Sequence, residues 1–388
     1  MKYSPVIVVA AFNRAKSLKR LLSSLSKAKK IKNVKLIISI DNNEPYNNDI
    51  REIANQYEWP FGEKEVIFQA KRLGLRKHIL QCGDLTKEYG SVIILEDDLY
   101  VSPYFYDYAI QALSFYDEDE KISGISLYGQ PIEDIHDKPF APLYDDSDVF
   151  FLQFPSSWGQ AWTEKHWQFF REWLEVNPDI SSLPIHKHIL SWPESSWKKY
   201  FIAYMQATNK FFVFPRFSIT TNFNDPGTHN VRLIDFNRQT QLQISECKYR
   251  FKNLFDSYCH YDSHFELFPE TIKRFSNYLK TYEFEVDLYG TKDLSQFNKP
   301  YVITSRPVKS YLSGYARALK PHDMNVILEL EGKELFLCRK EDVLPIKNKP
   351  LKELSDYKYF YSSIIIGKKA FLYEHLSKYK LFSFLNNY

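Results

Sequence analysis

Over the first hundred residues, short runs of β-branched residues alternate with longer segments of helical periodicity. This alternation predicts βαβ units around a mostly parallel sheet, and therefore an α/β fold. In open α/β sheets, ligands collect beyond the carboxyl ends of the strands, where a rigid scaffold holds the loops. We expect strands at 6–10, 34–40, 66–68, 91–95, 122–127 and 211–214, and helices at 17–25, 75–85 and 104–116.

Length and composition indicate an ordinary globular protein with room for two domains. Of its 388 residues, 44% are hydrophobic and 26% are charged. The 51 basic and 48 acidic side chains give a net charge of +3, which is too small to predict a nucleic-acid partner. The four cysteines lack CxxC spacing, so we expect reduced structural thiols. Without a recognisable signal peptide or a run of about 18 apolar residues, the prediction is a soluble, cytoplasmic protein.

Beyond about residue 236 the sequence becomes rich in Tyr, Lys and Phe. We therefore expect an α/β domain at 1–235 and a smaller α+β extension at 236–388. Within the extension, residues 368–384 mix lysines with apolar side chains. As a basic amphipathic helix, this segment would make a peripheral contact with an anionic membrane. Core packing and a homodimer contact are the alternatives.

Three consecutive carboxylates, Glu96-Asp97-Asp98, directly follow the apolar strand predicted at 91–95. Such groups repel one another unless a cation or hydrogen-bond donors compensate them. Oxygen ligands favour Mn²⁺ or Mg²⁺, so the triplet predicts a divalent-cation site. Acids that decorate the start of a helix are the alternative explanation.

Two further loops should converge on this triplet, because they also follow strands of the predicted sheet. Phe12 and Arg14 follow the first strand, and Arg14 would reach a nucleotide phosphate or base edge unless it is an ordinary surface arginine. Asp41 ends the second strand. It would accept a hydrogen bond from a pyrimidine N–H, or else form an Asx turn or a helix cap.

Two other segments carry groups that suit anions. Arg72 and Lys77 flank Gly74 just before a predicted helix, either as an anion site or as a solvated helix start. His229 follows the Asp225-Pro226-Gly227 turn. It is a candidate metal ligand or phosphate donor, with a structural histidine as the alternative.

Taken together, four motifs resemble those of GT-A glycosyltransferases, especially the N-acetylglucosaminyltransferase I type and its bacterial relatives. The resemblance covers roughly residues 3–235, and the C-terminal region resembles extensions of bacterial polysaccharide glycosyltransferases. The motifs are Val-Val-Ala-Ala-Phe-Asn-Arg at 8–14, Ser-Ile-Asp-Asn-Asn at 39–43, Leu-Gly-Leu-Arg-Lys-His at 73–78 and Leu-Glu-Asp-Asp-Leu at 95–99.

The resemblance implies a GT-A, Rossmann-like fold and a nucleoside-diphosphate sugar donor, most often a UDP-sugar. It places Arg14 and Asp41 near the nucleotide, Asp97 near the ribose or donor sugar, and Asp98 on the metal. It also implies that Glu96 faces the donor sugar and that His229 lies close to the diphosphate.

One segment departs from the family pattern. Inverting members carry an acidic general base in a Trp-Asp segment, whereas this chain reads Ser196-Trp197-Lys198-Lys199. Glu194 or Asp225 would have to supply the base, unless the mechanism differs. For Glu194, the alternative is an acid in the first turn of a helix.

The predicted function is therefore metal-dependent transfer of a sugar from a UDP-sugar to a glycan or lipid-linked acceptor in bacterial surface-polysaccharide assembly. A nucleotidyltransferase is one rival, although residues 11–14 lack the Gly-rich phosphate loop that it would normally show. The other rival is a catalytically silent module that binds a nucleotide or a glycan.

Overall fold

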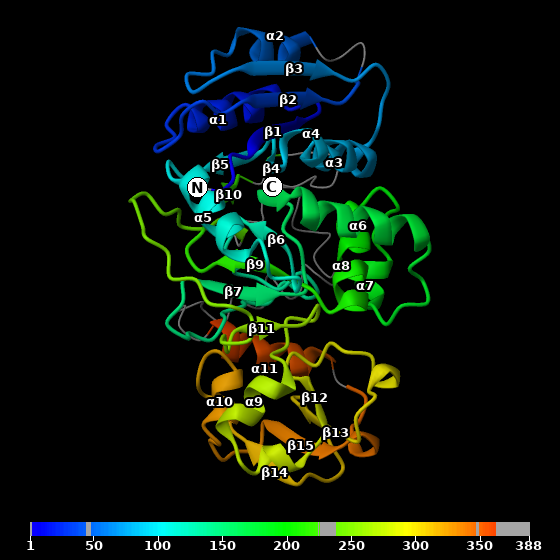
Figure 1. Ribbon diagram of the computed structural model, residues 1–388. Helices are drawn as coiled ribbons and strands as arrows, with labels where there is room; N and C mark the ends of the chain where they lie inside the picture. The colour runs from blue at the N-terminus through cyan, green and yellow to red at the C-terminus, as the bar shows by residue number, and fades with distance from the viewer. Residues whose placement is uncertain (1, 44–47, 224, 226–237, 347–348, 362–388) are drawn as a thin grey trace, which may run out of the picture.

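The computed structural model describes residues 2–43, 48–223, 225, 238–346 and 349–361. At its centre lies a nine-stranded sheet with helices around it (Figure 1). The strand order is β11-β7-β9-β6-β8-β4-β1-β2-β3. The strands are β1 (Val6–Ala11), β2 (Leu36–Ile40), β3 (Lys64–Phe68), β4 (Ser91–Glu96), β6 (Ile122–Ser126), β7 (Val149–Leu152), β8 (Gln160–Thr163), β9 (Phe211–Pro215) and β11 (His260–Tyr261).

The pairing confirms the predicted α/β class. β1 pairs in parallel with both β2 and β4, and β2 pairs in parallel with β3. β8 runs antiparallel between β4 and β6. The carboxyl ends of β1, β2 and β4 therefore meet at one edge, as the strand pattern predicted.

The sheet is buried on both faces, which explains why β1 reads as a continuous apolar run. Val8 packs into one hydrophobic cluster, and its neighbours Ile7 and Val9 pack into another on the opposite face. Successive side chains of a strand point to opposite faces, so a single strand contributes to both clusters.

Helices cover the sheet, and α1 shows the periodicity that predicted it. Its Leu18, Leu21, Leu22 and Leu25 are buried. A two-stranded antiparallel ribbon, β5 (Leu99–Val101) with β10 (Thr220–Asn222), lies beside α1. The helices of this part are α1 (Ala15–Leu25), α2 (Asn48–Gln56), α3 (Leu75–Asp84), α4 (Thr86–Tyr89), α5 (Phe105–Tyr116), α6 (Glu164–Val176), α7 (Lys187–Leu190) and α8 (Trp197–Thr208).

The C-terminal part forms a second sheet of four strands, in the order β12-β13-β15-β14. It occupies the end of the molecule away from β2 and β3 (Figure 1). Its elements are β12 (Phe284–Asp287), β13 (Tyr301–Thr304), β14 (Ser313–Tyr315), β15 (Leu335–Arg339), α9 (Pro269–Phe275), α10 (Asp323–Ile327) and α11 (Lys349–Tyr361).

The two sheets share a hydrophobic core, because Phe284 and Ile303 belong to the same cluster as Phe150 and Trp162. The predicted boundary at 235–236 lies outside the described residues. β11, which follows it in the chain, pairs with β7, so the larger sheet takes in residues beyond that boundary.

All four cysteines are free thiols, as expected, and Cys82, Cys259 and Cys338 are buried. Among the described helices, none is both long and apolar enough to span a bilayer. The segment 368–384, predicted as an amphipathic helix, lies outside the described residues.

Candidate functional site

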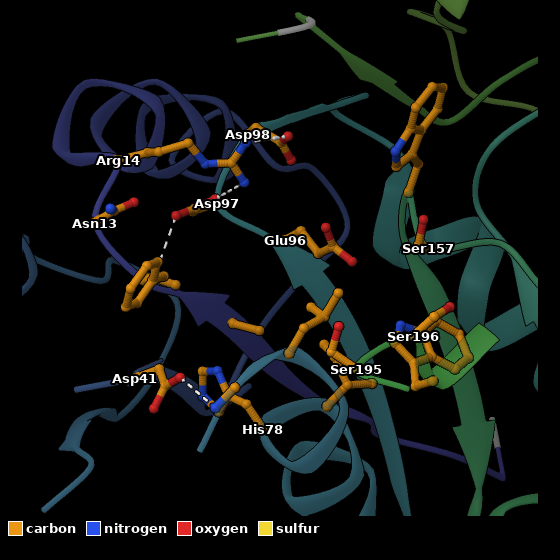
Figure 2. Close-up of a pocket in the computed structure, with 18 of the residues that line it drawn as sticks. Asn13, Arg14, Asp41, His78, Glu96, Asp97, Asp98, Ser157, Ser195 and Ser196 are labelled. Carbon is orange, nitrogen blue, oxygen red and sulfur yellow. Dashed lines mark hydrogen bonds and ion pairs between the residues drawn. The ribbon is translucent and has the colours of Figure 1, made fainter. Parts of the chain in front are cut away.

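A cavity of about 460 Å³ lies beyond the carboxyl ends of β1, β2 and β4 (Figure 2). It is lined by residues from seven separate parts of the chain. The lining includes most of the residues predicted from the sequence: Phe12, Arg14, Asp41, Arg72, Glu96, Asp97, Asp98 and Asp225.

Arg14 holds the two aspartates that follow β4. Its Nη1 donates to Asp98 Oδ2 over 2.7 Å, and its Nη2 forms an ion pair with Asp97. The backbone N–H of Phe12 also donates to Asp97, over 3.3 Å. Burial raises the pKa of Asp97 to about 6 although Arg14 pulls it down, so Asp97 remains ionised at neutral pH and the contact is an ion pair.

The second oxygen of Asp98 is the feature that fits a metal ion. Asp98 Oδ1 is buried and has no hydrogen-bond partner among the described residues. An unpaired buried carboxylate oxygen costs free energy unless a donor or a cation completes it. The described residues contain no group of three His, Cys, Asp or Glu side chains arranged for a metal. A Mg²⁺-type ion takes one or two carboxylates and fills its other positions with water and substrate phosphates, so Asp98 alone would suffice.

The carboxyl group of Glu96 lines the cavity and forms no ion pair or hydrogen bond with any described residue. Burial, reinforced by the neighbouring Asp98 carboxylate, raises the pKa of Glu96 to about 8. Figure 2 shows its side chain in the cavity with those of Asp98 and Ser157. It is thus a carboxyl group that remains available to a ligand.

Asp41 organises a neighbouring loop. Its two oxygens accept hydrogen bonds from the backbone N–H groups of Leu73, over 2.8 Å, and Gly74, over 2.9 Å. Gly74 has a φ of 76°, a conformation that glycine adopts without the strain a Cβ would cause. These bonds engage both carboxylate oxygens with N–H groups of the loop that precedes α3, so Asp41 holds this loop in place rather than capping the helix.

The two predicted cations near this loop differ in position. The Arg72 guanidinium lies over the Phe12 ring, 4.2 Å from its centroid, and both residues line the cavity. Lys77 is exposed on α3 and does not line the cavity. The structure therefore brings Arg72, but not Lys77, to the site.

Three helices begin at the cavity wall with no side chain capping the first turn. Their N-cap residues are Arg14 of α1, Gly74 of α3 and Ser196 of α8, and all three line the cavity. Uncapped helix N-termini present N–H groups and a positive dipole end, which favours an anion such as a phosphate.

The candidates for the base occupy different places. Asp225 lines the cavity, but Ser17 Oγ donates to it over 2.7 Å and Arg20 forms an ion pair with it. Both contacts lower the pKa of Asp225 against the effect of burial.

Glu194 does not line the cavity; its side chain is 77% exposed, and Lys199 Nζ donates to it over 2.5 Å. The hydrogen bonds from Lys199 and Tyr200 lower its pKa. Helix α8 starts so that Ser196 and Lys198 face the site, which turns Glu194 outward. The structure therefore gives no support to Glu194 as a base. His229 lies outside the described residues.

Some lining residues were not predicted as site residues. Lys198 is one, and its Nζ lies 3.1 Å from Asp134 Oδ2 and 4.6 Å from the centroid of the Phe154 ring. Ser195, Ser196 and Asn222 are others. The start of α8 after Pro193 was the available signal, because a helix N-terminus presents its first residues to whatever faces it.

No protein-family model and no curated protein matches this chain. Solved structures do align with it, at low identity. S. aureus TarS in complex with UDP-GlcNAc shares 14% identity over 59% of this chain and 60% of that one, with a TM-score of 0.35. The mannosyltransferase PcManGT from Pyrobaculum calidifontis, in complex with GDP-Man and Mn²⁺, shares 12% over 59% of each chain, with a TM-score of 0.37.

A cytidylyltransferase from Leptospira borgpetersenii shares 13% identity over 45% of this chain and 72% of that one, with a TM-score of 0.26. The alignments with TarS and PcManGT span less than two thirds of those chains. At these scores the matches do not assign an activity to the chain.

Proposed function

We propose that this chain is a glycosyltransferase that uses a nucleoside-diphosphate sugar, most simply a UDP-sugar, and a divalent cation. One observation carries the proposal: a single cavity combines the unpartnered Asp98 oxygen with three uncapped helix N-termini. The first suits a cation and the second suits phosphates. A metal–diphosphate ligand needs both side by side.

Each part of the cavity has a task in this proposal. Asp98, together with water and the donor's phosphates, would hold Mn²⁺ or Mg²⁺, which would neutralise the diphosphate as it departs. The N-terminus of α8, with Lys198, offers donors to the phosphates. Arg14 keeps Asp97 and Asp98 fixed, so that little reorganisation is needed when the donor binds.

On the acceptor side, we propose a hydroxyl of a glycan or glycolipid in surface-polysaccharide assembly, following the motif resemblance. We assign the binding of this hydroxyl to Glu96, because its carboxyl group lines the cavity and no described residue engages it. It can accept a hydrogen bond from a sugar hydroxyl and orient it for an inverting displacement. Asp225 is less suited because Arg20 and Ser17 already engage its carboxylate.

The release of nucleoside diphosphate from UDP- and GDP-sugars, with Mn²⁺ or with EDTA, tests the proposal. Wild type should release the diphosphate from one donor only when Mn²⁺ is present, and Asp98→Asn should lose at least about a hundredfold of that rate. Asp84→Asn is the matched control, because its carboxylate pairs with Arg171 outside the cavity. Tight binding of UDP with no release from any donor would instead favour the silent binding module.

A further inference from the structure

A second cavity, of about 640 Å³, lies in the C-terminal part against the edge strand β14. It shares no lining residue with the first cavity. In Figure 1, β14 lies at the end of the molecule opposite β2, away from the strand ends that form the first site. Its wall includes Tyr278, Tyr311, Tyr315, Glu329, Glu331 and Lys333.

Two glycines in the lining keep part of the wall free of side chains. Gly332 donates its backbone N–H to the Gly314 carbonyl over 3.3 Å. A Cβ on Gly314 would lie 2.4 Å from the Gly332 oxygen, so only glycine permits this approach. The two glycines thus let the backbone segments around residues 314 and 332 approach each other closely in this wall, and neither adds a side chain to the cavity.

Two tyrosine rings of the wall are exposed yet held in place. Tyr278 is 42% exposed and Tyr311 is 47% exposed. Tyr282 packs edge-on against Tyr278 at 5.1 Å and donates its hydroxyl to that of Tyr278 over 3.2 Å. Phe336 packs against Tyr311 at 5.0 Å. Held aromatic faces lose little conformational entropy when a ligand stacks on them.

Glu329 occupies an unusual backbone position for its residue type. It follows the C-cap of α10, with a φ of 50°, where helices usually place glycine or asparagine. Its carboxylate lines the cavity and accepts a hydrogen bond from Ser276 Oγ over 2.5 Å. A glutamate at this position carries a backbone cost that its side chain must offset.

The mixed charges of the wall argue for a neutral ligand. Lys333 disfavours a cation, and Glu329 with Glu331 disfavours an anion. A sugar suits both kinds of charged group, because its hydroxyls donate to carboxylates and accept from an ammonium. Its C–H face meets the electron-rich face of a tyrosine ring.

We propose that this second cavity binds a neutral glycan chain, with Tyr278 and Tyr311 stacking on its sugar rings. The volume falls within the range of about 300 to 1,000 Å³ that is typical of ligand sites. A glycan held here would be tethered to the protein, which raises the effective concentration of its remaining length. The site stands apart from the proposed transfer reaction and requires neither the nucleotide nor the metal.

Affinity electrophoresis in gels that contain dextran, yeast mannan, galactomannan or xyloglucan tests this site without nucleotide. At least one polysaccharide should retard wild type, and Tyr278→Ala or Tyr311→Ala should weaken binding about tenfold. Tyr144→Ala is the matched control, since Tyr144 is 66% exposed and lines neither cavity. Failure of every gel to retard wild type, or equal retardation of the tyrosine variants, would overturn the proposal.

Glu329→Gly separates binding from folding. It removes the carboxylate and places glycine at a φ of 50°, so its Tm should match or exceed that of wild type while retardation falls. Undiminished retardation would count against the site. Sedimentation of Tyr311→Ala checks whether this face instead joins two copies, in which case a wild-type dimer would become a monomer and the glycan proposal would fail.

Asp98→Asn should keep its retardation. Failure of nucleotide binding at the first cavity and failure of glycan binding at the second are therefore distinguishable.

Discussion

Arg14 donates to one oxygen of Asp98 over 2.7 Å, while the other oxygen of the same carboxylate is buried without a partner among the described residues. The arginine compensates part of the negative charge at the end of β4 and leaves one oxygen for a ligand. The site is thus preorganised, since a cation arriving at Asp98 meets a carboxylate that is already fixed in position.

Replacing Arg14 should make the stability of the fold depend more strongly on a divalent cation. Arg14→Gln leaves Asp97 and Asp98 without their counter-charge, and removing one partner of a buried pair costs about 3 kcal/mol. Mn²⁺ should restore more stability to Arg14→Gln than it adds to wild type, as measured by urea unfolding with Mn²⁺ and with EDTA. Arg171→Gln, which breaks the Arg171–Asp84 pair, is the control and should show no such rescue.

Asp41 should contribute mainly to the structure of the loop that contains Leu73 and Gly74. Asp41→Ala removes acceptors from the N–H groups of Leu73 and Gly74, and each unsatisfied buried group costs about 1 to 3 kcal/mol. Hydrogen exchange at these two amides should accelerate strongly in the variant. Unchanged exchange together with weakened nucleotide binding would instead indicate that Asp41 contacts the nucleotide directly.

His166 should make the fold less stable in mild acid. The side chain is 2% exposed, and burial lowers its pKa to about 4, against the opposing effect of Asp117. The neutral ring is thus favoured in the fold, so its contribution is complete above pH 6.5 and is lost as the pH falls towards 4.

Between pH 7 and pH 5, wild type should therefore lose on the order of 2 kcal/mol more stability than His166→Phe. Urea unfolding of both proteins at the two pH values measures the difference. Parallel losses in the two proteins would show that folding does not lower the pKa of His166.

The elements that could be predicted are those whose buried residues form a clear apolar pattern in the sequence. β1 and residues 92–95 of β4 are unbroken apolar runs, so the ends of these strands, and with them the meeting of Arg14 and Asp98, followed from strand order. α2 was missed because only Ile50 and Ala54 are buried among its described side chains. The outward turn of Glu194 depends on how α8 packs against α3 and α6, which no local pattern encodes. The second cavity was missed for the same reason, since Tyr278 and Tyr311 are 33 residues apart in the chain.

Calorimetric titration of UDP, with Mn²⁺ and with EDTA, tests the central claim most directly. Wild type should bind UDP in Mn²⁺ and lose most of that affinity in EDTA, and Asp98→Asn should bind weakly in both. At about 100 times Kd, the ligand should also stabilise wild type by about 2.7 kcal/mol, and Glu194→Gln should behave like wild type. Equal UDP affinity for wild type and Asp98→Asn in Mn²⁺, or no binding to folded wild type, would contradict the account.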